Sequence, residues 1–132
     1  MSQGGQVETH YERLGGAGRI RELVDRFYDL MEFEAAYAGI RALHGSTLDH
    51  ARDKLFMFLS GWTGGPQLYI ERFGHPRLRQ RHMPFSIGET ERDQWMQCMT
   101  QAMDELEVDP TLRRELTAAF YKTADFMRNR AG

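Results

Sequence analysis

The sequence predicts an all-α fold, and three features of its 132 residues support this prediction. Apolar residues recur at steps of three and four along most of the chain, which is the period of an amphipathic helix. Glycine and proline residues interrupt these stretches, as they do at helix ends. The strict apolar–polar alternation of a half-buried strand is missing from the printed sequence. A chain of this length corresponds to one domain of roughly 100–200 residues.

The N-terminal part predicts an extension, one helical turn and a long helix. Within a single domain over 1–132, we expect residues 1–10 to form a flexible N-terminal extension. Gly15 and Gly16 break the chain, so residues 8–14 form at most a separate turn of helix. An apolar stripe then predicts a long helix from Ala17 onward, and it consists of Ile20, Leu23, Val24, Phe27, Tyr28 and Met31.

Two further helical patterns follow before the middle of the chain. The first is short and ends near Gly45; its apolar residues are Tyr37, Ile40 and Leu43. Ser46, Thr47 and Asp49 then offer caps for another helix, which the Gly-Gly-Pro at 64–66 stops. The stripe of that helix consists of Leu48, Ala51, Leu55, Phe58, Leu59 and Trp62.

The middle of the chain, residues 67–88, predicts short turns and a long loop. Glycine and proline punctuate it at Gly74, Pro76, Pro84 and Gly88. It is also the one strongly basic segment, with Glu71 as its single acid beside Arg72, Arg77, Arg79 and Arg81. A loop of about 20 residues inside a compact domain is uncommon and often functional. We therefore expect this segment to hold something flat and anionic.

Regular helix resumes after Thr90 and continues, with one break, to the C-terminal region. Glu91 and Asp93 lie in the first turn, where acids suit the positive end of the helix dipole. Asp109 and Pro110 predict an N-cap and a first helical residue. The two stripes consist of Trp95, Cys98, Met99, Ala102, Met103 and Leu106, and of Leu112, Leu116, Ala119, Phe120, Thr123, Ala124 and Met127. The sequence therefore predicts four substantial helices and an irregular middle segment.

Composition and charge exclude several classes of protein. With 41% hydrophobic and 27% charged residues, wholesale disorder is not expected. No apolar run approaches the roughly 20 residues of a membrane span, and the polar N-terminus is unlike a secretory signal. A net charge of −2 gives no reason to expect nucleic acid. The single Cys98 fits a reducing compartment and cannot supply a four-thiolate zinc site. We expect a cytoplasmic protein with no membrane or nucleic-acid partner.

His82 is the most informative titratable residue of the chain. Pro84 follows closely and prevents the helix from continuing over it, so the imidazole lies at or just past a helical turn. One axial histidine is enough to bind haem iron, whereas zinc or copper usually needs several protein ligands. Apolar residues for a haem slot are Leu55, Phe58, Phe85 and Trp95, and cations for its propionates are Lys54, Arg79 and Arg81. A helical core with a solvated basic loop would contain the same set, so spacing alone leaves both readings open.

Three segments of the chain resemble the group II truncated haemoglobins. They are RFYDLM at 26–31, FLSGWTGGPQLY at 58–69, and GHPRLRQRHMPFSIGETERDQWMQCM at 74–99. The Gly-His-Pro-Arg run that ends at His-Met-Pro-Phe, followed by Glu-Arg-Asp and a tryptophan, is highly specific. The resemblance extends over about 11–127. It implies a globin-like, two-over-two helical sandwich with an irregular loop before and around the proximal histidine.

The resemblance also assigns roles to individual residues. His82 matches the proximal haem-iron ligand, whose second ring nitrogen would donate to a backbone carbonyl. Tyr28, His44 and Trp95 match the distal residues that stabilise a bound ligand; for His44, a helix-end histidine facing water is the alternative. The remaining expected haem contacts are Ala51, Lys54, Leu55, Phe58, Tyr69, His75, Leu78, Arg79, Arg81, Phe85 and Ile87. For His75, which lies in the turn Gly-His-Pro, a structural hydrogen bond is the alternative.

The function that the resemblance implies is reversible binding of O₂, CO or NO at a haem b, with slow release. The runner-up is a haem enzyme with NO dioxygenase or peroxidase-type chemistry, for which a separate reductase would serve the iron. A third possibility is an interaction module that uses the methionines Met96, Met99 and Met103, which are more often core residues. We expect a monomer or a weak homodimer.

Overall fold

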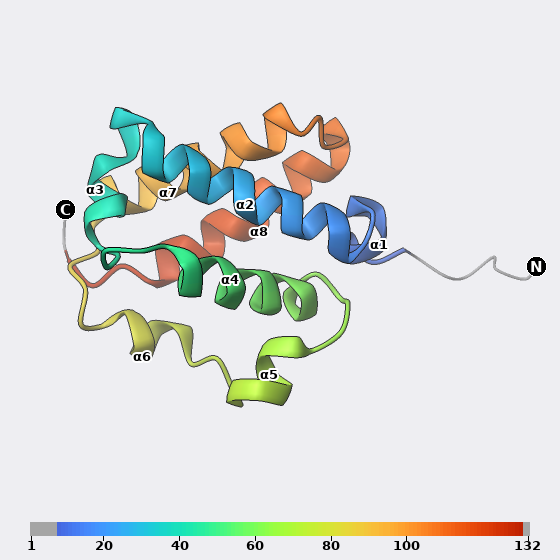
Figure 1. Ribbon diagram of the computed structural model, residues 1–132, viewed down its shortest axis with the longest axis horizontal. Helices are drawn as coiled ribbons and strands as arrows, with labels where there is room; N and C mark the ends of the chain where they lie inside the picture. Colours follow the sequence, from blue (N-terminus) through green and yellow to red (C-terminus); the bar gives the residue numbers. More distant parts are fainter. Residues whose placement is uncertain (1–7, 131–132) are drawn as a thin grey trace, which may run out of the picture.

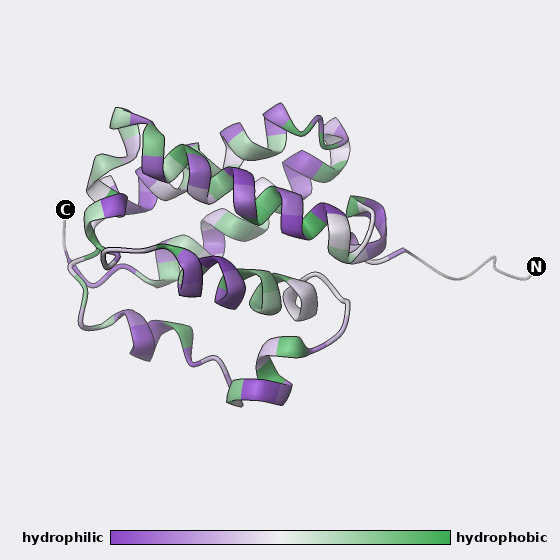
Figure 2. Ribbon diagram, in the orientation of Figure 1, coloured by the Kyte–Doolittle hydropathy of each residue, from purple (hydrophilic) through white to green (hydrophobic). Residues whose placement is uncertain are grey.

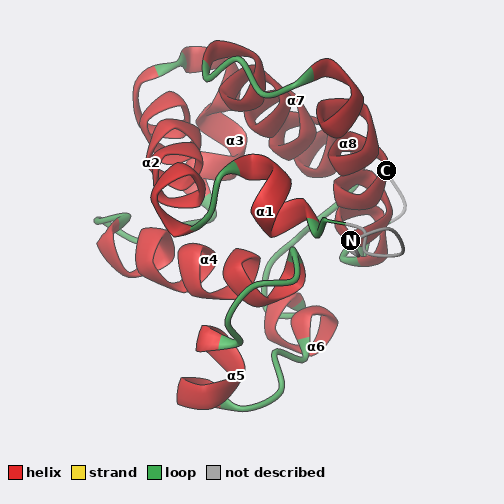
Figure 3. Cartoon of the chain, turned by 90° about the vertical axis from the view of Figure 1, so that its right-hand side faces the viewer, coloured by secondary structure: helices red, strands yellow, loops and turns green. Residues whose placement is uncertain are grey.

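Four long helices and several short ones make up the computed structural model, which describes residues 8–130 (Figure 1). Figure 3 shows that helices and loops account for all of that range, without a strand. The elements in chain order are α1 (His10–Leu14), α2 (Ala17–Phe33), the 3-10 helix η2 (Ala35–Tyr37), α3 (Ala38–Ala42), α4 (Asp49–Trp62), α5 (Leu68–Phe73), α6 (Leu78–His82), α7 (Glu89–Glu105) and α8 (Pro110–Phe126). The all-α prediction and its four substantial helices are confirmed.

The N-terminal helical turn begins earlier than an extension over 1–10 would allow. The Thr9 hydroxyl accepts from the Glu12 N–H at 3.1 Å, and the Glu12 carboxylate accepts from the Thr9 N–H at 2.9 Å. This reciprocal cap starts α1 at His10. Gly15, with a left-handed φ of 109°, ends it. Thr9 and His10 therefore belong to the folded domain and not to an extension, whereas residues 1–7 lie outside the described range.

Capping residues in the sequence determine where the last two helices begin. The Asp109 carboxylate accepts from the Leu112 N–H at 3.1 Å, and Pro110 is the first residue of α8, as predicted. Helix α7 begins at Glu89, slightly before the predicted start. There the Glu91 carboxylate accepts from the Gly88 N–H at 2.7 Å.

The middle of the chain contains more helix than the sequence predicted. Two short helices, α5 and α6, lie on the side of α4 that faces away from α2 (Figure 1). Gly74 ends α5 with a φ of 80°, and Arg77 precedes α6 with a φ of 47°, so both residues are in the left-handed region. Helices of five or six residues show no periodic pattern, because they complete fewer than two turns.

The core lies where α2 contacts α4 and α7, and α7 in turn contacts α8. Hydrophilic and hydrophobic residues alternate around the α2 ribbon, as an amphipathic helix requires (Figure 2). Met99 and Met103 are fully buried, so these methionines are core residues and offer no surface for a partner. Cys98 is also fully buried; its thiol donates to the Phe27 carbonyl, and burial raises the pKa of the thiol to about 12. Within residues 8–130 no helix is both long and apolar enough to cross a membrane.

Candidate functional site

A cavity of about 580 Å³ lies among α4, α6 and the neighbouring parts of α7 and α8. This volume falls within the roughly 300–1,000 Å³ that is usual for ligand and cofactor pockets. Most residues predicted to contact haem line it: Tyr28, His44, Ala51, Lys54, Leu55, Phe58, Tyr69, Leu78, Arg81, His82, Phe85, Ile87 and Trp95. Segments that are far apart in the sequence therefore meet at one largely apolar wall.

His82 is the last residue of α6 and presents one free ring nitrogen. Its Nδ1 lies 2.6 Å from the carbonyl oxygen of Leu78. A carbonyl can only accept, so Nδ1 carries the proton and donates. In the neutral ring Nε2 therefore keeps its lone pair, which is the form that binds a metal ion. The predicted bond from the second ring nitrogen to a backbone carbonyl is present.

Asn129 fixes the chain just after His82, and no pattern in the sequence singles this residue out. Its Nδ2 donates to the carbonyls of His82 and Phe85 at 3.2 and 2.8 Å, and its Oδ1 accepts from the Ile87 N–H at 2.9 Å. These three hydrogen bonds from one side chain stabilise the turn that follows α6. The position of the His82 backbone therefore depends on the C-terminal end of the chain.

Two hydrogen-bond donors, Tyr28 of α2 and Trp95 of α7, line the same cavity. Neither the Tyr28 hydroxyl nor the Trp95 indole N–H is bonded to another residue in the described range, and both rings are packed by carbon. The Trp95 ring lies 5.2 Å from that of Phe27 and 5.5 Å from that of Phe120, between centroids. Burial raises the pKa of the Tyr28 hydroxyl, so it stays protonated and able to donate.

His44, which follows α3, lies beside Tyr28 with a ring-centroid distance of 5.9 Å. Its Nδ1 lies 2.9 Å from the Ile40 carbonyl oxygen and therefore donates to it. Burial lowers the pKa of this imidazole, so the ring is neutral at pH 7. Its Nε2 is consequently an acceptor, where the sequence led us to expect a donor.

Comparisons with known proteins agree with this arrangement. The profile of the bacterial-like globin family matches residues 9–129. The group 2 truncated haemoglobin YjbI of Bacillus subtilis is 35% identical over 126 residues, which is 96% of this chain and 92% of the relative. The chain belongs to the group II truncated haemoglobins.

Solved structures of the family match this haemoglobin over nearly its whole length. The cold-adapted truncated haemoglobin of Pseudoalteromonas haloplanktis TAC125 superposes with a TM-score of 0.89 and 45% identity, covering 93% of this chain and 99% of that one. The group II 2-on-2 haemoglobin of Agrobacterium tumefaciens has a TM-score of 0.90 and 40% identity, covering 98% of each chain. The two-over-two fold is thereby confirmed, and membership of this family implies a haem cofactor.

The cavity of this haemoglobin fits haem chemically. The His82 imidazole, whose Nδ1 bonds to Leu78, has the unprotonated Nε2 that an iron ligand would need, and apolar side chains supply most of the wall. Cations and a phenol lie at its rim: the Arg81 guanidinium is 6.0 Å from the Tyr69 ring centroid, and Lys54 comes from α4. Charged groups there can meet two propionates while the ring stays among carbon atoms.

Two residues expected to contact haem lie away from the cavity. The Nδ1 of His75 accepts from the Arg77 N–H at 3.0 Å and so stabilises the turn before α6. The Arg79 guanidinium donates to the Arg128 carbonyl at 3.3 Å and lies 5.8 Å from the Phe126 ring centroid. The structural hydrogen bond expected for His75 in this turn is therefore present, and a haem contact by His75 or Arg79 stays a prediction.

Several cavity residues of the haemoglobin were missed by sequence reasoning. They include His50, Trp62, Phe120, Thr123, Ala124 and Met127. The stripe of the last helix was recognised as apolar, but the pattern does not distinguish packing against a helix from facing a cavity. His50 is an exposed residue that also lines the cavity.

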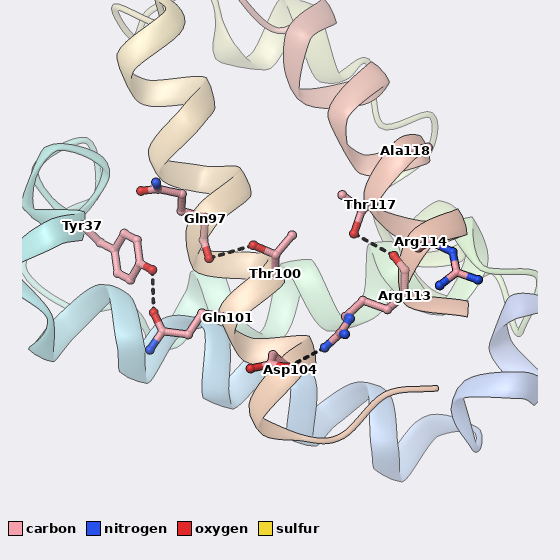
Figure 4. A pocket seen from close by; sticks show the side chains of 9 residues that line it. All are labelled: Tyr37, Gln97, Thr100, Gln101, Asp104, Arg113, Arg114, Thr117 and Ala118. Carbon is pink, nitrogen blue, oxygen red and sulfur yellow. Dashed lines mark hydrogen bonds and ion pairs between the residues drawn. The ribbon is translucent and has the colours of Figure 1, made fainter. Parts of the chain in front are cut away.

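A larger but open groove of about 940 Å³ runs between α7 and α8 (Figure 4). Two polar pairs lie along it: Arg113 donates to Asp104 at 2.6 Å, and the Tyr37 hydroxyl donates to Gln101 at 2.6 Å. No histidine or cysteine lines it, so it offers no ligand of the kind that haem iron takes. The smaller cavity, not the groove, is therefore the candidate functional site.

Proposed function

We propose that this haemoglobin binds O₂ and other diatomic gases reversibly at a haem b held by His82. The observation that carries the proposal is the pairing, within one apolar cavity, of a free His82 Nε2 with two unengaged donors, Tyr28 and Trp95. Haem bound here would supply an iron atom that takes one protein nitrogen and leaves one position for a gas. The chain supplies orientation, exclusion of water and hydrogen bonds.

Tyr28 and Trp95 govern how long a gas stays. Each can donate one hydrogen bond to a polarised ligand, and a bond to a charged group contributes roughly 1.5–3 kcal/mol, or about 10- to 100-fold in rate. Ala51, which lines the same cavity, has no side-chain hydrogen-bond donor. Two such donors support slow release, which suits holding or reacting O₂ better than shuttling it.

His44 takes a different part, as an acceptor. Because its Nε2 is unprotonated, it can receive the Tyr28 proton but cannot donate to a ligand. Replacing His44 by leucine should therefore leave the O₂ dissociation rate at pH 7 unchanged or slower, since Tyr28 is freed to donate. Stopped-flow measurement of that rate checks this. His50→Leu, at an exposed residue that lines the cavity, is the matched control, and a faster rate confined to His44→Leu would contradict the acceptor role.

Absorption spectra of the ferric, ferrous and CO-bound forms test the proposed function. We expect a haem spectrum, a five-coordinate ferrous form with histidine ligation, and a saturable change with CO. A colourless protein that cannot take up haem, or a ferrous form that does not bind CO, would refute it. Turnover with peroxide or NO by the wild type and by His44→Leu separates a carrier from the enzyme alternative.

A further inference from the structure

Most arginines of this haemoglobin are engaged by carboxylates, but those around α5 are not. Arg52, for example, donates to Asp29 at 2.7 Å, and Arg92 donates to Asp125 at 2.8 Å. In contrast, no ion pair within residues 8–130 involves the four cations Lys54, Arg72, Arg77 and Arg81. These four residues, together with Ile70 and Phe73, form what we call the basic face.

The basic face is built around two aromatic rings in tilted contact. The centroids of Tyr69 and Phe73 are 4.9 Å apart. The Lys54 Nζ lies 5.6 Å and the Arg72 guanidinium 5.3 Å from the Phe73 ring centroid. The rings thus hold cations of α4 and α5 in one place by cation–π contacts, without neutralising them.

Apolar side chains are exposed on the same surface. Ile70 is 47% and Phe73 is 38% exposed, although each is large enough to be buried. Exposed apolar residues framed by cations are typical of protein interaction sites, in which arginine and aromatic residues are enriched. The basic face therefore has the composition of an interface, in addition to its charge.

The basic face is also continuous with the haem cavity. Lys54, Tyr69 and Arg81 line the cavity, whereas Arg72 and Arg77 do not. The two propionates of a bound haem can pair with the cations of the cavity wall, Lys54 and Arg81. Arg72 and Arg77 would then keep their charges for a partner. A partner seated on the basic face would contact the rim of the cavity.

The distribution of charge selects the kind of partner. Residues 67–88 carry a formal charge of +3, because four arginines accompany the single Glu71. Since the whole chain carries −2, the remainder carries −5. A small acidic protein can touch the basic face alone, whereas an extended polyanion such as a membrane surface or a nucleic acid would meet the acidic remainder as well.

We propose that the basic face docks a small acidic one-electron carrier protein, which would reduce a ferric haem held in the adjoining cavity. This inference rests on the proposed function and names its partner. The reduced carrier would supply one electron to a ferric haem held by His82, giving the ferrous form, and no bond would be made or broken. Encounters of this kind use small interfaces and charge steering, which a mixed cationic and apolar surface provides.

The test uses haem-loaded protein and an acidic plant-type [2Fe–2S] ferredoxin as the probe. Binding of the oxidised ferredoxin is measured by titration calorimetry at low and at physiological salt, and reduction of the ferric protein by the reduced form is followed by stopped flow. Arg72→Glu and Arg77→Asn should each weaken binding, and together by roughly tenfold or more, with a smaller salt dependence. Arg114→Glu, a similarly unpaired arginine in the α7–α8 groove, is the matched control.

Several results would overturn this inference. Equal affinities for the wild type and the double variant, an equal loss in Arg114→Glu, or tighter Arg72-dependent binding to anionic phosphatidylglycerol vesicles or duplex DNA would each do so. The CO-bound spectrum of the double variant separates this question from the proposed function. An unaltered CO-bound spectrum with weakened ferredoxin binding supports docking at the basic face. Failure of the wild type to bind CO would instead contradict the gas-binding proposal.

Discussion

Replacing His82 by alanine should abolish stable retention of haem. This imidazole is the only histidine of the cavity wall that belongs to α6, and its ring is oriented by the bond from Nδ1 to Leu78. Loss of an outer partner of a metal ligand typically costs about 10–100-fold in metal affinity, so loss of the ligand itself should exceed that range. The measurement is the rate of haem transfer to an excess of a scavenging apoglobin, together with the ferrous spectrum.

His75→Ala is the matched control for this experiment. His75 lies in the same basic segment but bonds to Arg77 and does not line the cavity, so its loss should leave haem retention unchanged. Free imidazole added to His82→Gly should restore a histidine-type spectrum, which a purely structural defect would not allow. Wild-type retention in His82→Ala would mean that another side chain holds the iron.

Much of the fold was predictable because glycine, proline and capping residues mark the helix ends. Gly15 and Gly16, Asp109 and Pro110 all act as their residue types require. The short helices α5 and α6 were not predictable, since they span too few turns to show a period. Their positions are set by tertiary contacts, such as the bonds that Asn129 makes far along the chain.

The residues of the candidate site were predictable mainly where they belong to a specific family motif. Residues of the segment 74–99 matched the family pattern, and the structure brings His82 and Trp95 to one cavity. Side-chain direction was beyond the sequence: Arg79 turns toward Phe126, and the Nδ1 of His44 turns toward Ile40. A pattern fixes which residues share a helix face, but the protonated nitrogen of a ring depends on which carbonyl lies next to it.

Replacing Trp95 by phenylalanine should accelerate O₂ dissociation by about 10- to 100-fold, the factor expected for one hydrogen bond to a charged group. Phenylalanine keeps an aromatic ring against Phe27 and Phe120, so the change removes chiefly the indole N–H. The rate is measured by stopped flow, with the ferrous–O₂ protein mixed against CO. Trp62→Phe is the control, because this second indole of the cavity wall stacks on Phe120 at 4.7 Å and is not assigned to the ligand.

Combining Trp95→Phe with Tyr28→Phe determines whether the two donors act independently. If each bonds the ligand separately, the logarithms of the two accelerations add in the double variant. If one donor can replace the other, each single change has a small effect and the double change a large one. Rates equal to the wild type in all three variants would show that neither donor holds the ligand, and slow release would then need another cause. Because the Tyr28 hydroxyl stays protonated through burial, these rates should not depend on its ionisation below pH 10, roughly the ordinary pKa of a tyrosine.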